Sequence, residues 1–141
     1  TNRQAAHPHV RRLLIDLDNG PEIASSRTQF MKRLVNFSDR HQLTLELAYY
    51  PPYHSKYNRI ERCWGVLENH WNGALLNTVE TALQWAQTMT WRGVAPLLHL
   101  LDRTYDTGVR LTKQLFRPIA ERLLRSSTLP KWSLTIPPRP R

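Results

Sequence analysis

The chain has 141 residues, a length that suits one domain and allows a buried hydrophobic core. Its net charge of +9 and pI near 10.4 favour a polyanionic partner such as DNA or RNA, although any soluble basic protein has such a charge. The single cysteine, Cys63, excludes an internal disulfide and a multi-cysteine zinc site, and no apolar run approaches the roughly 20 residues of a membrane span. We therefore expect an intracellular protein without a membrane segment.

A strand, a helix and a second strand are predicted in the first 50 residues. Residues 12–18 predict a short buried strand, which the turn sequence Asn-Gly-Pro ends. Residues 26–41 predict a helix with a capping box at its start and an apolar stripe of Phe30, Leu34 and Phe37. Residues 43–49 alternate apolar with smaller or polar side chains, which predicts a half-buried strand. This order suggests a parallel crossover in an α/β sheet, and two strands alone imply further strands upstream.

The rest of the chain is predicted to be mainly helical. Helices are expected at about 59–71, 78–91 and 109–125, the second capped by Thr78 and the third kinked by Pro118. Ile60, Trp64, Leu67 and Trp71 mark the expected buried face of the first of these helices. The tryptophans, Trp91 included, could stack on bases, but core packing is favoured.

The C-terminal segment is proline-rich and strongly basic. Residues 130–141 hold four prolines and predict an extended arm. Residues 107–141 carry eight basic side chains and one acid, which is +7 of the total charge. Such a segment either lies along phosphates or forms a solvated basic surface, and the sequence leaves both open.

Two acids are candidates for chemistry. Asp18 ends the first strand, where open α/β sheets place their ligands, but Asp-Asn-Gly is also an ordinary turn. Asp16, one pleat deeper on the same face, is expected to be a buried acid with its hydrogen bonds satisfied. Glu61 lies in the first turn of the helix after the second strand. It can form a capping box with Asn58, or it can remain an ionised metal ligand favoured by the helix dipole.

The positions of Asp18 and Glu61 support a joint role. An acid that ends one strand and an acid that begins the helix after the neighbouring strand can converge at one end of a sheet. Two or three carboxylates there can hold two metals roughly 3.5–4 Å apart. One metal would activate water or a 3′-hydroxyl and the other would stabilise the leaving oxygen. This chemistry is phosphodiester cleavage or strand transfer.

Two motifs resemble a known family. Residues 18–22 (DNGPE) resemble the segment around the second acid of integrases and transposases of the ribonuclease H-like superfamily, and residues 50–64 (YPPYHSKYNRIERCW) resemble the segment around their third acid. The chain resembles most the ISAzo-type group of DDE transposases, also called the Rhodopirellula transposase family, over about residues 11–125. The resemblance implies that Asp18 and Glu61 are metal ligands for Mg²⁺ or Mn²⁺ in a two-metal site, with Asn58 shaping the turn before Glu61.

The resemblance also implies partners and a cellular place. DNA, both element ends and target, is the expected partner, bound by a homo-oligomer in the cytoplasm at the nucleoid. Lys56, Arg59 and Arg62 are the expected DNA contacts. The alternative is ordinary loop polarity for Lys56 and a helix-surface charge for Arg62. Arg59 stands where relatives usually have proline, whose preset φ suits the first helical position, so Arg59 is expected to loosen this turn.

The family's first acid has no counterpart in the chain, because residues 1–15 contain no Asp or Glu. We therefore expect a disordered leader (1–10), the C-terminal part of a ribonuclease H-like α/β domain (11–125) with about two strands and several helices, and a proline-rich basic tail (126–141). Such a chain is expected to need the upstream part of the same transposase and to be inactive alone. The alternatives are a non-enzymatic basic DNA-binding module and a decayed transposase remnant.

Overall fold

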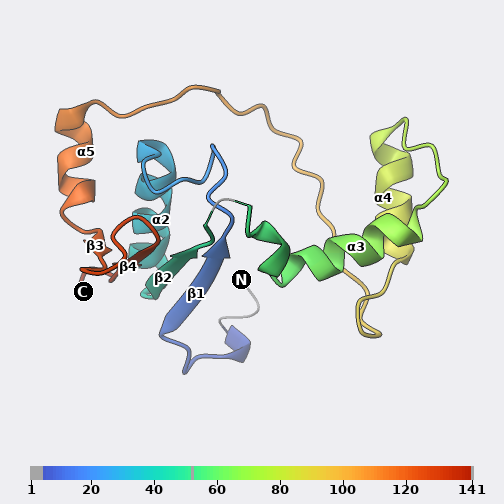
Figure 1. The fold of residues 1–141 in the computed structure, drawn as a ribbon, viewed down its shortest axis with the longest axis horizontal. Helices are drawn as coiled ribbons and strands as arrows, with labels where there is room; N and C mark the ends of the chain where they lie inside the picture. Colours follow the sequence, from blue (N-terminus) through green and yellow to red (C-terminus); the bar gives the residue numbers. More distant parts are fainter. Residues whose placement is uncertain (1–4, 52, 141) are drawn as a thin grey trace. The chain divides into compact units, whose positions relative to one another are not determined.

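The computed structural model describes residues 5–51 and 53–140, which form two compact units (Figure 1). The first unit combines Thr1–Ser55 with Thr107–Arg141, and the second is Lys56–Asp106. Residues 1–4 of the expected leader lie outside the described residues.

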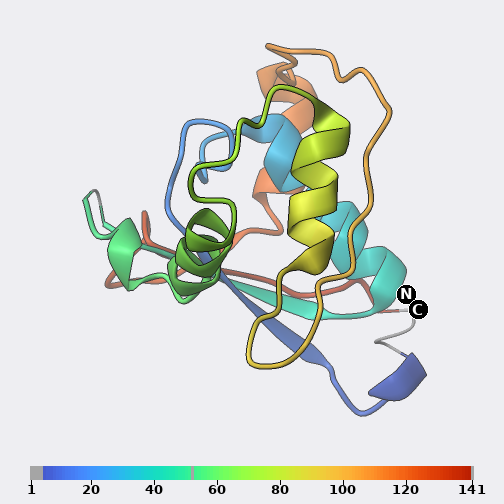
Figure 2. The same cartoon turned by 90° about the vertical axis from the view of Figure 1, so that its right-hand side faces the viewer.

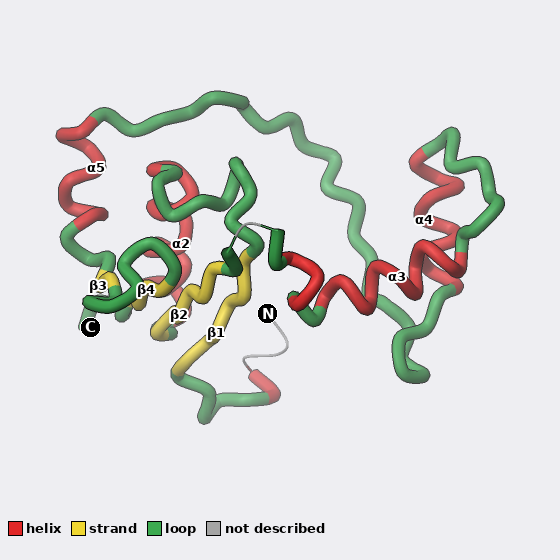
Figure 3. Tube along the Cα trace, viewed as in Figure 1, coloured by secondary structure: helices red, strands yellow, loops and turns green. Residues whose placement is uncertain are grey.

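The first unit contains a four-stranded mixed sheet in the order β1-β2-β4-β3 (Figure 3). Strands β1 (Arg12–Leu17) and β2 (Thr44–Tyr49) are parallel and are joined by helix α2 (Thr28–His41), so the predicted crossover is confirmed. Strand β4 (Ser133–Ile136) runs antiparallel to β2, and β3 (Leu124–Arg125) runs antiparallel to β4.

The expectation of about two strands was wrong, because the C-terminal segment supplies two more. Strand β4 lies within the segment expected to be an extended arm, with Leu134 and Ile136 buried and Thr135 half-buried. This alternation has the period of a strand that buries one face. Pro130 and Pro137 lie outside the strand, where they remove no hydrogen bond of the sheet, so the proline content did not prevent its formation.

Helix α2 covers one face of the sheet, and it is turned differently from the prediction. Its buried residues are Met31, Val35 and Ser38, whereas Phe37 is 40% exposed. Phe30 and Leu34 are only partly buried at the edge of the core. The residue at the N-cap is Arg27, without a side-chain cap, so the predicted capping box at residues 26 and 29 does not form.

Helix α5 (Lys113–Ala120) packs against α2 and is shorter than the predicted helix 109–125. It begins after Thr112, whose Oγ1 accepts a hydrogen bond of 3.3 Å from the N–H of Leu115. Pro118 lies inside the helix and offers no N–H for its hydrogen bonds, and the helix ends two residues later. The chain then turns into β3.

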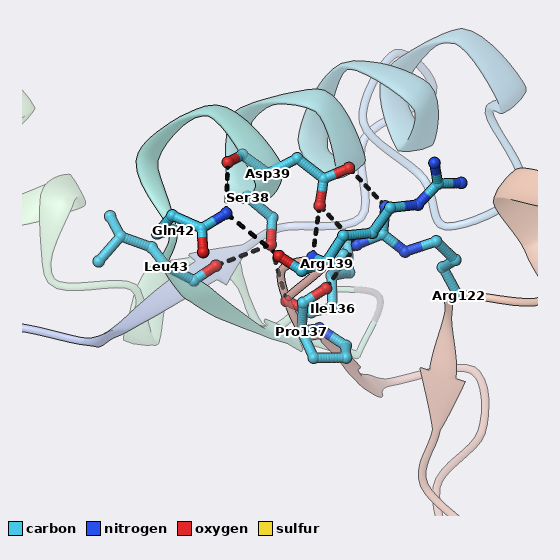
Figure 4. A network of polar contacts seen from close by, with 8 residues as sticks. All are labelled: Ser38, Asp39, Gln42, Leu43, Arg122, Ile136, Pro137 and Arg139. Atoms are coloured by element: carbon cyan, nitrogen blue, oxygen red, sulfur yellow. Dashed lines mark hydrogen bonds and ion pairs between the residues drawn. The ribbon is translucent and has the colours of Figure 1, made fainter. Parts of the chain in front are cut away.

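A polar network ties α2 to the C-terminal segment (Figure 4). The Arg122 guanidinium donates to both carboxylate oxygens of Asp39 at 2.6 and 2.7 Å and to the carbonyl oxygen of Pro137 at 2.6 Å. The backbone N–H of Arg139 donates to Asp39 at 2.8 Å. At the edge of the core, the hydroxyl of fully buried Ser38 donates to the Leu43 carbonyl oxygen at 2.7 Å.

This network uses part of the C-terminal basic charge. Besides Arg122, Arg125 donates to the carbonyl oxygens of Ser25 and Pro130 at 3.0 and 2.9 Å. Arg117 of α5 pairs with Glu121, the residue that follows the helix, at 3.2 Å. These three guanidinium groups therefore have structural partners within the first unit.

The ion pair predicts an acid-dependent stability. Hydrogen bonds from Arg122 are the main cause that lowers the pKa of Asp39 below its ordinary value of 3.8, against an opposing effect of burial. Because the folded carboxylate resists protonation, its contribution is complete above pH 3.8 and is lost as the pH falls through the lowered folded pKa. Asp39→Asn is expected to cost about 1–3 kcal/mol at pH 7 and to flatten the acid limb of the stability curve. Urea denaturation at a series of pH values measures both effects. An unchanged acid limb in this variant would contradict the assignment.

The second unit contains helices α3 (Ile60–His70) and α4 (Val79–Thr88) (Figure 2). Thr78 caps α4 as predicted, because its Oγ1 accepts from the N–H of Thr81 at 3.1 Å. His70 links the two helices through a 2.9 Å hydrogen bond to Thr88 and an edge-to-face contact with Trp85.

The buried face predicted for α3 is not found. Trp64 is 52% exposed and Ile60 is 43% exposed, and no residue of α3 is fully buried. The side chains of Ile60 and Trp64 therefore remain accessible. None of the helices in the described ranges has the length and apolar character of a membrane span.

Candidate metal-binding acids and their surroundings

Asp18 is positioned by the end of the β1–β2 pairing. The N–H of Tyr50 donates to the carbonyl oxygen of Leu17 at 2.7 Å, which continues the parallel ladder up to the residue before Asp18. The Asp18 side chain is exposed, and its Oδ1 accepts a hydrogen bond of 3.1 Å from the N–H of Gly20. Asn19 adopts a left-handed φ of 62° within this turn. The turn therefore holds one carboxylate oxygen in place at the surface.

Gly20 gives this turn its room. A Cβ at this position would lie 3.3 Å from Oδ1 of Asp18, closer than ordinary van der Waals contact. A larger residue would displace the carboxylate by a few tenths of an ångström. The Asn-Gly pair thus shapes the turn and sets the orientation of Asp18.

Asp16 does not fit its predicted role, because its side chain is exposed. Ile15 and Leu17 pack against the core, so their alternating neighbours on β1 face the opposite side of the sheet. Leu14 on that side is 61% exposed. The acid at position 16 therefore remains in contact with solvent.

Glu61 lies in the first turn of α3, as predicted. Its N–H donates to the carbonyl oxygen of Asn58 at 3.0 Å, and Oδ1 of Asn58 accepts from the N–H of Ile60 at 3.4 Å. Among residues 5–51 and 53–140, no side-chain hydrogen bond or ion pair is found for the exposed Glu61 carboxylate. The reciprocal capping box is therefore not formed among the described residues, and Glu61 lies in the helix turn that carries the positive end of the dipole.

Arg59 takes the helical conformation that proline would impose. Its φ of −59° and ψ of −26° lie in the right-handed helical region, and proline fixes φ near this value. The expected loosening of the turn by Arg59 is therefore not seen in its backbone.

Asp18 and Glu61 lie on different units, Asp18 on the first and Glu61 on the second. No group of three or more His, Cys, Asp or Glu side chains with the arrangement of a metal site occurs within the described part of the chain. The convergence of Asp18 and Glu61 on a common metal stays a prediction.

Basic side chains surround the first turn of α3. Lys56, in the short 3-10 helix η1 (Ser55–Tyr57), places its Nζ 5.3 Å from the centre of the Tyr57 ring. Arg59 and Arg62 line an open hollow of ≈ 510 Å³ together with Trp91 and Arg92. Arg92 was not among the residues predicted from the sequence. The signal for it is Trp-Arg-Gly-Val, a turn sequence that carries a cation beside an aromatic residue.

The comparison with known families adds a decisive observation. The family described as "Rhodopirellula transposase DDE domain" matches residues 1–138. The chain belongs to this family. The match extends beyond the predicted range of 11–125 and takes in β4, in agreement with the place of this strand inside the sheet. No curated protein and no solved structure matches this chain.

Proposed function

We propose that this DDE domain belongs to a DNA transposase that cleaves and joins phosphodiester bonds with divalent metals, and that Asp18 and Glu61 are two of its metal ligands. The observation that carries the proposal is the Glu61 carboxylate, exposed in the first turn of α3 and not used in a capping box. The carboxylate has no structural role among the described residues, so it is available to bind a cation. Family membership supplies the reaction class.

The two side chains suit a hard divalent cation. Mg²⁺ and Mn²⁺ prefer oxygen ligands, and each acid offers a carboxylate at the surface. The hydrogen bond from Gly20 occupies only part of the acceptor capacity of Asp18, which has about four lone-pair sites. A bound metal pair would supply Lewis-acid activation of the attacking and leaving oxygens. In this scheme the turn at Gly20 orients the Asp18 carboxylate, and the first turn of α3 carries the Glu61 carboxylate.

A third carboxylate completes the proposed acid set. The resemblance assigns it to a strand upstream of Asp18, so we propose that the chain supplies the second and third acids and is inactive without the first. We also propose DNA ends and target DNA as partners, a homo-oligomer on DNA, and a place at the nucleoid.

Paramagnetic broadening by Mn²⁺ tests whether the two acids share a metal. In NMR spectra of the isotope-labelled chain, added Mn²⁺ is expected to broaden the amide signals around both Asp18 and Glu61, because one ion lies near both. Asp18→Asn is expected to weaken the broadening at Glu61 as well as at its own position. Broadening that stays confined to one of the two segments would contradict a shared site.

The hollow beside α3 favours a second function, that of a non-enzymatic DNA-binding module. Three arginines on one small surface suit phosphate binding without any metal. DNA binding that depends on salt, is unchanged in Asp18→Asn and is unaffected by Mg²⁺, together with absent Mn²⁺ broadening, would support this function in place of catalysis.

A further inference from the structure

We propose that Arg59, Arg62, Trp91 and Arg92 form a binding site for single-stranded DNA, in which arginines hold phosphates and Trp91 stacks on an unpaired base. We call these four residues the basic pocket. The inference rests on the proposed function only for the choice of DNA as ligand. The geometry of the pocket lies entirely within the second unit.

Two elements meet in the basic pocket. Arg59 and Arg62 are three residues apart at the start of α3 and therefore lie on the same side of the helix. Trp91 and Arg92 belong to a tight turn in which the N–H and C=O groups of Trp91 and Val94 exchange hydrogen bonds of 2.9 and 3.0 Å. The hollow between them measures ≈ 510 Å³, within the roughly 300–1,000 Å³ usual for ligand sites.

The chemistry of the lining selects a nucleic acid strand. Its three guanidinium groups carry three positive charges and present planar pairs of donors that match phosphate oxygens. Trp91 is half-buried, with the Arg92 guanidinium 5.5 Å from its ring centre. Single-strand binding sites combine cationic side chains with an aromatic platform for bases in this way. A base within a duplex stays stacked on its neighbours and cannot lie on the indole, so an unpaired strand is the occupant.

The backbone of Arg92 provides a second, independent observation. Arg92 and Gly93 have φ values of 51° and 77°, as a type I′ turn requires at both central positions. Asn and Gly suit such a position, whereas an arginine there is strained. An unfavourable residue at an exposed turn points to a role of its side chain, because strain of this kind concentrates at functional sites.

A variant that relieves this strain tests the guanidinium without disrupting the turn. Arg92→Asn creates Asn-Gly, a favoured type I′ pair, and removes the guanidinium. The matched control is Arg103→Ala, which removes an equal charge from an exposed position of the same unit outside the basic pocket. Trp91→Ala removes the aromatic ring on which a base would stack, whereas Trp91→Phe keeps an aromatic ring at this position.

Fluorescence anisotropy with a labelled oligothymidylate, at several salt concentrations and without divalent metal, measures the effect. Arg92→Asn is expected to weaken binding roughly 10-fold or more and to reduce the salt slope by about 0.7, the value for one phosphate contact on a single strand. Trp91→Ala is expected to weaken binding roughly 5- to 150-fold, with substantial recovery in Trp91→Phe. Arg103→Ala should change binding by less than about 2-fold.

Three outcomes would overturn the proposal. Equal losses in Arg92→Asn and Arg103→Ala would show that only overall charge matters. Equally tight binding of a duplex, with the same response to Trp91→Ala, would exclude base stacking. Preference for an RNA strand of the same sequence would assign the pocket to RNA. The binding measurement contains no metal. The proposal for the basic pocket can therefore be correct even if the Mn²⁺ experiment shows that Asp18 and Glu61 share no ion.

Discussion

Replacing Ile136 with alanine is expected to lower the free energy of unfolding of the first unit by about 2–5 kcal/mol. Ile136 is fully buried on β4, and β4 lies between β2 and β3 in the sheet. Its side chain packs in the same cluster as Met31, Leu45 and Leu47, so the substitution leaves a cavity among three elements. Urea denaturation followed by circular dichroism measures the change.

A neighbouring residue on β4 provides the control for Ile136. Thr135 is half-buried on the other face of the strand, and Thr135→Ala is expected to cost less than about 1 kcal/mol. Removal of residues 126–141 should go further and abolish the cooperative unfolding transition, because it takes away β4, which is the antiparallel partner of β2 and carries the buried Leu134 and Ile136. A truncated chain that unfolds like the whole chain would show that the C-terminal segment is dispensable.

Replacing Glu61 with glutamine is expected to weaken Mn²⁺ binding by the chain at least about 10- to 100-fold. The amide keeps the shape of the side chain but loses the charge that a divalent cation needs. Where the complete acid set is present, the same change is expected to abolish metal-dependent strand cleavage. Titration calorimetry with Mn²⁺ measures the first effect and a DNA nicking assay the second.

Glu80 is the matched control for Glu61. It also lies in the first turn of a helix of the second unit and is exposed, so Glu80→Gln removes the same charge from the same kind of helix position. Binding and cleavage should be unchanged in this variant. Equal effects of the two substitutions would show that Glu61 acts only through its charge. Robust nicking by the unmodified chain that is lost in Glu61→Gln would refute the predicted inactivity and would support Glu61 as a site residue.

Local patterns in the sequence determined the N-terminal half of the fold. The alternation of residues 43–49 and the turn after residue 18 identify β2 and the end of β1, because both depend on neighbours along the chain. The same local motifs indicated the family that the match to residues 1–138 shows. Asp18 and Glu61 were therefore accessible as candidates from the sequence, and their joint role is still a prediction.

Tertiary structure alone decided what depends on partners far away in the chain. Met31, Val35 and Ser38 form the buried side of α2 because they face a sheet whose position the helix sequence does not encode. The four-residue strand β4 pairs with β2, about 90 residues earlier in the sequence, as well as with the nearby β3. A proline-rich segment gives no local signal of such long-range pairing. The basic pocket joins residues about 30 positions apart, from the start of α3 and from the turn at Trp91–Val94 that follows α4. The sequence by itself thus determined local elements and the family, while the long-range packing of the sheet and the meeting of Arg59 with Arg92 were decided by the fold.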